Sequence, residues 1–158
     1  MAITWTCKHH SELDAHEVYA FLALRCQVFV VEQKCPYLDV DGQDLEADTC
    51  HVMAWEDGQL LAYLRLLDPS TQEGDVVIGR VVSAAEARGR GLGHGLMERA
   101  VTEAEKRWPG MPVYLSAQAH LQGYYGRYGF SAVTEVYLDD GIPHVGMRKK
   151  LPALPIRR

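Results

Sequence analysis

The amino-acid sequence predicts a mixed α/β fold, built from one largely antiparallel sheet with helices on both faces. Strand-like and helix-like patterns follow each other in the order β-α-β-β-β-α-β-α-β-β. An Asp57-Gly58 pair between two strand-like segments is a strong signal for an antiparallel hairpin. A glycine-rich loop then separates a strand-like segment from the longest helix-like one. Together these observations indicate a sheet that begins antiparallel and carries helices on either side.

The length and composition indicate one ordinary globular domain. The chain has 158 residues, of which 47% are hydrophobic and 23% charged, and these values exclude a disordered, collagen-like or coiled-coil chain. No apolar run approaches the ~20 residues that span a bilayer, and the first residues lack the pattern of a signal peptide. We therefore expect a single cytoplasmic domain over residues 1–150 with no membrane partner. Residues 151–158 contain two prolines, cannot continue a sheet and are expected to form a loose tail.

Charge and cysteine usage narrow the classes of partner. The net charge of −5 argues against a general nucleic-acid binder, which carries a basic stripe. The four cysteines contain no C-x-x-C pair and the seven histidines no H-E-x-x-H pattern, so we expect no metal site. We expect the cysteines to be free thiols of a reducing cytoplasm.

The amino-terminal part predicts a strand, a helix and a loop. Residues 3–8 alternate apolar and polar side chains, as a strand does. Ser11 is a favourable cap for a helix that follows it, and the β-branched run at 28–31 can turn extended at its end. Residues 34–50 predict an acidic loop, interpreted as solvated, with attraction of a cationic amine as the alternative. The apolar face of the helix consists of Val18, Phe21, Leu22, Cys26 and Phe29.

The central part predicts three strands and the longest helix. Residues 51–56 and 59–67 form the hairpin, and residues 75–83 form a third strand. Residues 91–108 predict a helix that Pro109-Gly110 ends. Its apolar stripe consists of Leu92, Leu96, Ala100, Ala104 and Trp108.

The carboxyl-terminal part predicts a short buried strand, a short helix and two final strands. The strand covers residues 113–117, and the helix covers residues 121–128 and ends before Gly129. Residues 132–138 and 144–148 flank an Asp-Asp-Gly turn and read as strands. Because these strands lie at the edge of the predicted sheet, a homodimer is an expected possibility.

The glycine-rich loop predicts an anion site. Four glycines within residues 89–95 let the backbone approach a ligand closely, and the first amides of a helix have no partner inside the helix. The helix dipole and the charges of Arg88 and Arg90 favour a phosphate or pyrophosphate. Gly93-His94-Gly95 stands where a Walker loop needs Gly-Lys-Ser/Thr, and a dinucleotide fingerprint is also absent.

These residues resemble a known superfamily. Arg88-x-x-Gly91-x-Gly93, after a strand and opening a helix, resembles the acetyl-CoA signature of the GNAT N-acetyltransferase superfamily. Residues 118–130, with tyrosines shortly before Gly129-Phe130, resemble its second motif, and residues 25–44 resemble its bacterial ElaA-like branch. The resemblance covers about residues 1–150 and implies a GNAT-like fold with splayed central strands.

The resemblance also implies how acetyl-CoA is bound. The strand before the loop would offer unpaired backbone groups to the pantetheine arm, and the loop amides would hold the pyrophosphate. Gln118 and Ala85 stand where the superfamily usually has asparagine and proline, and neither departure removes the cofactor expectation. The implied cofactor-binding residues are Val81, Val82, Ser83, Arg88, Gly89, Arg90, Gly91, Leu92, Gly93, His94 and Gln118.

Acetyl transfer to an amine needs an acid for the departing thiolate and a way to neutralise the amine. By its position before Gly129-Phe130, Tyr125 matches the family's general acid, whereas Tyr124 and Tyr128 are interpreted as packing residues. Glu32 and His51 are the candidate bases.

Each candidate base has a structural alternative. Glu32 can instead form an ion pair, for which Arg25 is the suggested partner, and His51 can be a hydrogen-bonded strand residue. Arg80 lies in an apolar strand, so it needs an internal acid such as Glu32 or Asp41, or else a substrate carboxylate.

The sequence thus predicts an N-acetyltransferase that moves an acetyl group from acetyl-CoA directly to a primary amine of a small molecule or peptide. No cysteine occupies a recognisable nucleophile motif, so a covalent acetyl-enzyme is not favoured. The alternatives are an acyl-CoA sensor without turnover and an enzyme resembling acyl-homoserine-lactone synthases.

Overall fold

The computed structural model describes residues 2–150, so the tail predicted at 151–158 lies outside the described residues. Within this range eight strands form one sheet in the order β1-β2-β3-β4-β5-β8-β6, and β7 pairs with β8. All neighbouring strands are antiparallel except β4 and β5. The strands are β1 Thr4–His9, β2 Cys50–Glu56, β3 Gln59–Leu67, β4 Val76–Ser83, β5 Val113–Gln118, β6 Ser131–Ala132, β7 Tyr137–Asp139 and β8 Ile142–Lys149.

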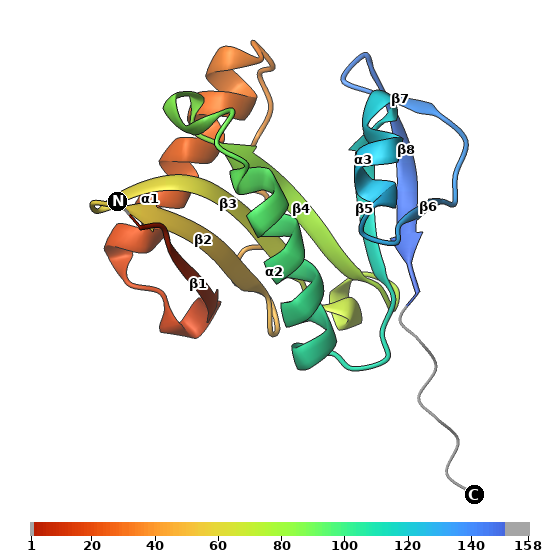
Figure 1. Cartoon of the computed structure of the whole chain (residues 1–158), viewed down its shortest axis with the longest axis horizontal. Coiled ribbons are helices and arrows are strands. Elements are labelled where there is room, and N and C mark those ends of the chain that lie inside the picture. The colour runs from red at the N-terminus through yellow and green to blue at the C-terminus, as the bar shows by residue number, and fades with distance from the viewer. Residues whose placement is uncertain (1, 151–158) are drawn as a thin grey trace, which may run out of the picture.

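Helices cover both faces of the sheet, as predicted. Figure 1 shows α2 in front of strands β2 to β4 and α1 behind them. One cluster of buried side chains packs beneath α2 and α3, and a second packs beneath α1. The helices are α1 Ala15–Arg25, its π-helical continuation Cys26–Glu32, α2 Leu92–Arg107 and α3 Gln122–Gly126.

The predicted hairpin is confirmed. Strands β2 and β3 are antiparallel and are joined by Asp57 and Gly58. Both residues have positive φ, 51° and 76° respectively. A two-residue turn of this kind requires positive φ at both positions, which is why an Asp-Gly pair signals it.

The first helix begins later than predicted, because Asp14 and not Ser11 caps it. The Asp14 carboxylate accepts a hydrogen bond from the Glu17 amide at 2.8 Å, and the Glu17 carboxylate accepts one from the Asp14 amide at 3.0 Å. This reciprocal pair satisfies two amides, whereas a single serine satisfies one. Ser11 instead lies in a short 3-10 turn, His10–Glu12.

The expected extended run at residues 28–31 is also wrong, because the chain continues as a π-helix. Its wider turns appear in the bonds from the Gln33 amide to the Val28 carbonyl at 3.1 Å and from the Cys35 amide to the Val30 carbonyl at 3.2 Å. The change of pitch shifts which side chains face the sheet. Val28 is buried as a result, and Cys26 is exposed rather than part of the apolar face.

Helix α2 follows its prediction closely. Four members of the predicted stripe are buried and Trp108 is partly buried. A Cβ atom on Gly95 would lie 2.5 Å from the Trp5 ring, so Gly95 allows α2 to pack against β1. This glycine therefore has a packing reason.

The strand predicted over residues 132–138 is wrong as one element, because β6 and β7 are separated by an irregular segment. The Thr134 hydroxyl accepts a hydrogen bond from the Gly146 amide at 2.8 Å, and the Val133 amide donates to the Gly146 carbonyl at 2.8 Å. A side chain thus takes a place in the ladder, and the regular pairing with β8 breaks there.

Strands β4 and β5 diverge, as the resemblance implied. They pair only at Val76 with Val113 and at Val77 with Tyr114, although both strands continue beyond these residues (Figure 1). Arg80 has a φ of 53°, and the β3–β4 register shifts at this place, which marks a bulge in β4.

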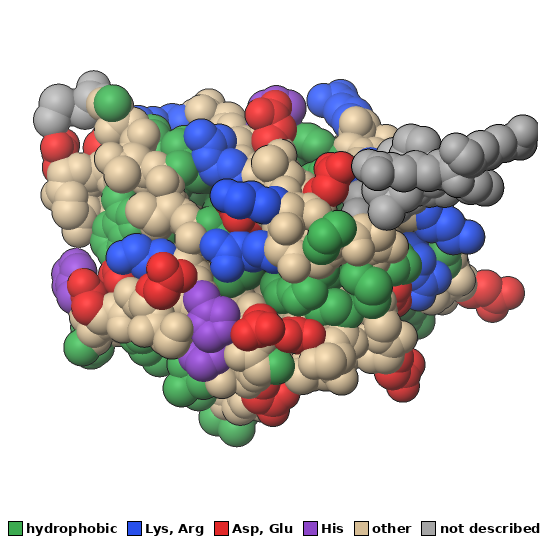
Figure 2. Space-filling view, turned by 90° about the horizontal axis from the view of Figure 1, so that it is seen from below, with side chains coloured by type: hydrophobic (Ala, Val, Ile, Leu, Met, Phe, Trp, Pro, Cys, Tyr) green, Lys and Arg blue, Asp and Glu red, His purple; other side chains and the backbone are tan. Residues whose placement is uncertain are grey.

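Positive and negative side chains are interspersed on the face shown in Figure 2. No helix in residues 2–150 combines the length and apolar character needed to cross a bilayer.

Candidate functional site

A cleft of about 880 Å³ lies where β4 and β5 separate. Its walls come from the π-helical segment and the loop after it, from β4 and β5, from α3, and from the turn between β7 and β8. Several residues predicted from the sequence line it: Glu32, Val81, Val82, Ser83, Arg88, Gln118 and Tyr125. His51 and residues 89–94 are not among its lining residues.

The glycine loop presents free backbone amides at the start of α2. Gly91 precedes the helix with a φ of 76°, and no side chain caps this end. Within the described range, the amides of residues 89–94 donate to no other group of the chain. A Cβ on Gly93 would lie 3.2 Å from the Tyr124 hydroxyl, so this glycine also allows close packing on α3. The loop therefore offers the unpaired donors that an anion needs.

The two arginines of the loop point to different carboxylates. Arg88 Nη2 lies 2.7 Å from Glu32 Oε2 and donates to the Ser83 carbonyl at 3.3 Å. Arg90 makes a two-pronged contact with Glu56 at 3.0 and 2.7 Å. The partner of Glu32 is thus Arg88 and not Arg25, and of the two loop arginines only Arg88 lines the cleft.

The three tyrosines of the second motif have different surroundings. Tyr125 lines the cleft and is 9% exposed, and its burial raises the pKa of the phenol. Tyr128 hydrogen bonds to His94, whose other ring nitrogen faces Glu98. Tyr124 packs edge-on against Tyr125 with ring centroids 5.1 Å apart. Neither Tyr124 nor Tyr128 lines the cleft.

His51 is enclosed in the sheet and is not brought to the cleft. Its side chain is fully buried, Nε2 lies 3.0 Å from the Asp44 carbonyl, and Nδ1 lies 2.6 Å from the Tyr63 hydroxyl. Burial lowers the pKa of His51 to about 4. Both ring nitrogens are occupied, so the structure supports the hydrogen-bonded strand residue and not the base.

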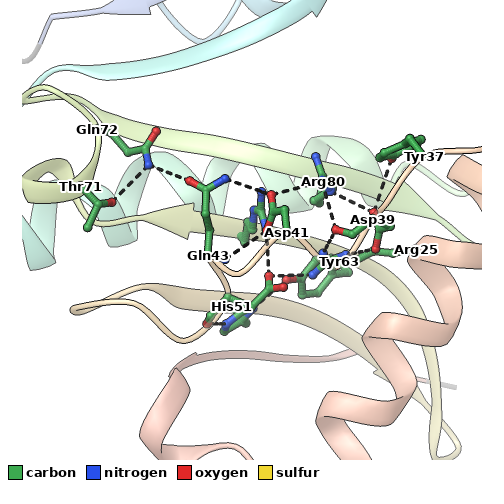
Figure 3. A network of polar contacts seen from close by, with 12 residues as sticks. Arg25, Tyr37, Asp39, Asp41, Gln43, His51, Tyr63, Thr71, Gln72 and Arg80 are labelled. Carbon is green, nitrogen blue, oxygen red and sulfur yellow. Dashed lines mark hydrogen bonds and ion pairs between the residues drawn. The ribbon is translucent and has the colours of Figure 1, made fainter. Parts of the chain in front are cut away.

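Much of the acidic loop is not solvated, because Asp39, Asp41 and Asp44 enter a network with arginines (Figure 3), whereas Asp48 stays exposed. Arg25 contacts Asp39 at 2.8 Å and Asp44 at 2.7 Å, and its side chain is fully buried. Arg65 contacts Asp44 at 3.0 Å. Buried charges persist only when they are paired, so this loop is fixed onto the sheet rather than free to attract an amine.

Arg80 joins the same network from the bulge in β4. Its guanidinium lies 2.9 Å from Asp39 and 3.2 Å from Asp41 and stacks over the Tyr37 ring (Figure 3). This is the internal pairing predicted as one of the two roles of Arg80. The side chain still lines the cleft with 23% exposure.

Sequence reasoning missed part of the cleft wall. Asp139 and Asp140 gave a turn signal in the sequence but no sign of a place at the cleft. The register of β5 and β8, which places His144 opposite Gln118, has no local sequence pattern. In residues 2–150, no three His, Cys, Asp or Glu side chains gather in a way that could hold a metal ion. The cleft residues that were not predicted include Lys34, Cys35, Tyr37, Ser116, Asp139, Asp140 and His144.

Comparison with known proteins agrees with this geometry. Residues 25–151 match the acetyltransferase (GNAT) domain family. The protein ElaA of Escherichia coli (strain K12) is 49% identical over 149 residues, covering 94% of this chain and 97% of ElaA. Its crystal structure superposes with a TM-score of 0.90 at 48% identity, covering 94% of this chain and 100% of that chain.

Two further structures bear on the reaction class. An acyl-CoA N-acyltransferase from Pseudomonas aeruginosa is 70% identical with a TM-score of 0.92, covering 94% of this chain and 99% of that chain. The CoA-dependent acyl-homoserine lactone synthase BjaI is 14% identical with a TM-score of 0.75, covering 96% of this chain and 84% of that chain. At this identity the likeness to BjaI is one of fold alone.

Proposed function

Because the chain belongs to the GNAT acetyltransferase family, we propose that it transfers an acetyl group from acetyl-CoA to a primary amine in one direct step. The observation that carries this proposal is the opened seam between β4 and β5, which adjoins a helix start with unpaired amides. An extended thioester arm and a diphosphate need these two features side by side.

The pantetheine arm would lie along β4. Val81, Val82 and Ser83 follow the last β4–β5 pair and line the cleft, so backbone groups on this side of the strand are free to bind an extended ligand. The diphosphate would bind to the amides of residues 89–94, and Arg88 stands beside them at the cleft. Gln118 lines the cleft from the opposite strand, β5.

Tyr125 would protonate the departing thiolate. Its burial keeps the phenol protonated at neutral pH, and a phenol can supply a proton to a thiolate that leaves. The neutral amine nitrogen attacks the thioester carbon, the carbon–sulfur bond breaks, and the sulfur takes the phenolic proton. The nitrogen releases one proton, and through solvent this proton restores the phenol, so the products are the amide and free CoA thiol. The remaining candidate base, Glu32, lines the cleft with its carboxylate already bound to Arg88.

The acceptor is a primary amine of a small molecule or peptide. The cysteines in the described residues are free thiols, which supports a reducing compartment such as the cytoplasm.

Two measurements on the wild-type protein test the proposal. Millimolar acetyl-CoA should raise the melting temperature, because it binds only the folded state. Acetyl-CoA with a panel of primary amines should release free CoA thiol at a rate that depends on the amine. A shift without thiol release would favour an acyl-CoA sensor, and an unshifted melt with the fold verified would refute acyl-CoA binding.

A further inference from the structure

One histidine in the cleft has a defined tautomer and an unoccupied nitrogen. His144 lines the cleft, and its Nδ1 lies 2.8 Å from the Ile142 carbonyl oxygen. A carbonyl oxygen only accepts hydrogen bonds, so Nδ1 carries the hydrogen of the neutral ring and Nε2 carries a lone pair. Nε2 makes no hydrogen bond to any residue in the described part of the chain.

The ring is held by its strand and by an aromatic neighbour. It stacks on Tyr137 with ring centroids 6.3 Å apart and an interplanar angle of 29°. The Tyr137 hydroxyl hydrogen bonds to Ser116 across on β5. His144 lies opposite Gln118 in the β5–β8 pair, so its position depends on a paired strand rather than on a loop.

His144 and Tyr125 approach the cleft from opposite faces of the sheet. Val145 and Met147 follow His144 on β8 by one and three residues, and both are buried with Tyr125 in the cluster beneath α2 and α3. Because successive side chains of a strand point to opposite faces, His144 points to the face that carries α1. Tyr125 can thus reach the thioester sulfur from one face of the sheet, and His144 can reach the amine nitrogen from the other.

We propose that His144 accepts the proton of the attacking amine through Nε2; this inference rests on the proposed function. The other two candidates are engaged elsewhere, since Glu32 is bound to Arg88 and His51 is enclosed. As the carbon–nitrogen bond forms and the carbon–sulfur bond breaks, the nitrogen releases one proton to His144. Tyr125 gives one proton to the sulfur and regains it from the imidazolium through solvent, so the products are the amide and free CoA thiol.

The charged neighbours of His144 leave its Nε2 accessible. The 3-10 turn Ala119–Leu121 packs against β8 and carries His120, which is exposed and does not line the cleft. None of the surrounding groups hydrogen bonds to Nε2. Tyr137 on β7 stacks on the ring. The other titratable and charged side chains that line the cleft are Glu32, Lys34, Cys35, Tyr37, Arg80, Arg88, Tyr125, Asp139 and Asp140.

The first test compares His144→Phe with the matched control His120→Gln. Phenylalanine keeps the stack on Tyr137 and removes both nitrogens. With n-butylamine, glycinamide and Nα-acetyl-lysine as acceptors, we expect His144→Phe to lower kcat/KM by about 10²–10⁴-fold. Acetyl-CoA affinity by calorimetry should stay unchanged, because His144 is proposed to act on the amine and not on the cofactor. The control should match the wild type, and equal turnover in His144→Phe would overturn the proposal.

The second test does not depend on turnover. Nitrogen-15 spectra of labelled protein, assigned by the signals missing in His144→Phe, report which ring nitrogen carries hydrogen. We expect the neutral ring to carry its hydrogen on Nδ1, and an Nε2–H form would overturn the proposal. Failure of the proposed function has a different signature: the wild type itself would show neither acetyl-CoA stabilisation nor thiol release.

Discussion

Arg88 and Glu32 form an ion pair, 2.7 Å between Nη2 and Oε2, that joins the loop before α2 to the end of the π-helical segment. Both side chains are partly exposed, at 48% and 30%. A phosphate that binds Arg88 must compete with this carboxylate. The pair therefore sets a cost on cofactor binding that substitution of Glu32 can reveal.

Replacing Glu32 by glutamine should tighten acetyl-CoA binding. An exposed ion pair contributes about 0.2–1 kcal/mol, so its removal should lower Kd by up to about fivefold. Glu56→Gln is the matched control, because it frees Arg90, which does not line the cleft. Calorimetric titration checks both variants, and a weaker Kd in Glu32→Gln would contradict the competition.

Gly91→Ala should separate backbone strain from ligand binding. Gly91 and Gly58 both have a φ of 76°, and a Cβ on either would meet nothing within 4 Å. Each alanine variant should therefore lose about 1–2 kcal/mol of stability for the same reason. Only Gly91→Ala should also reduce the melting shift produced by acetyl-CoA. An equal ligand shift in the two variants would place the diphosphate elsewhere.

Tyr125→Phe should lower kcat with little change in acetyl-CoA affinity. Loss of a general acid costs typically about 10²–10⁴-fold in rate. Because burial raises the pKa of Tyr125, its hydroxyl stays protonated through pH 9 and should cause no alkaline loss below that pH. Tyr124→Phe and Tyr128→Phe are the controls, and steady-state kinetics of all three decide the assignment. Equal turnover in the three variants would remove Tyr125 from the mechanism.

Asp44→Asn should destabilise the protein strongly and reduce the loss of its free energy of unfolding at acid pH. Burial opposes ionisation of Asp44, but Arg25 and Arg65 outweigh it and hold the pKa of this carboxyl below its usual range. The stabilisation is therefore present above about pH 4 and is lost as pH falls below that value. Removing one partner of a buried pair costs about 3–5 kcal/mol. Urea unfolding between pH 2 and 7 measures both effects, and an unchanged midpoint would contradict the network's role.

His51→Gln should change the pH dependence of stability and not that of catalysis. The pKa of His51 is lowered to about 4 by burial, so the unfolded chain binds more protons between pH 4 and about 6.5. Wild-type stability therefore rises with pH across this window, and the slope should decrease in the variant. Denaturant melts give the slope, and a kcat/KM profile on the same preparation should keep its shape. A lost kinetic limb would return His51 to the list of bases.

The elements that sequence alone predicted are those with complete local signals. The turn residues Asp57 and Gly58 carry their own backbone preference, and the stripe of α2 repeats within one helix. The glycine loop likewise combines an anion-binding backbone and a helix start within a few residues. The class of fold could therefore be inferred before the sheet was known, and the assignment of the glycine loop to a cofactor stays a prediction.

The rest depended on partners distant in sequence. Arg25 and Asp44 are 19 residues apart, and Arg65 and Asp44 are 21 apart, so an acidic loop that folds inward has the same local pattern as a solvated one. Strand register and burial in the sheet decide that His51 is enclosed and that His144 lines the cleft, and neither can be predicted from the neighbouring residues. Of these two histidines, the sequence had indicated only His51 as a candidate base.

The short pairing between β4 and β5 also divides the sheet into two halves that can rotate relative to each other. Only two residue pairs join the two halves of the sheet, so rotation about this line breaks few directional backbone bonds. Apolar packing beneath the seam opposes the rotation instead, through buried side chains such as Leu96 and Leu115. The separation of the two half-sheets is thus governed by side-chain volume. Substitutions that change the volume of these buried side chains are therefore expected to change the width of the cleft without altering any polar group.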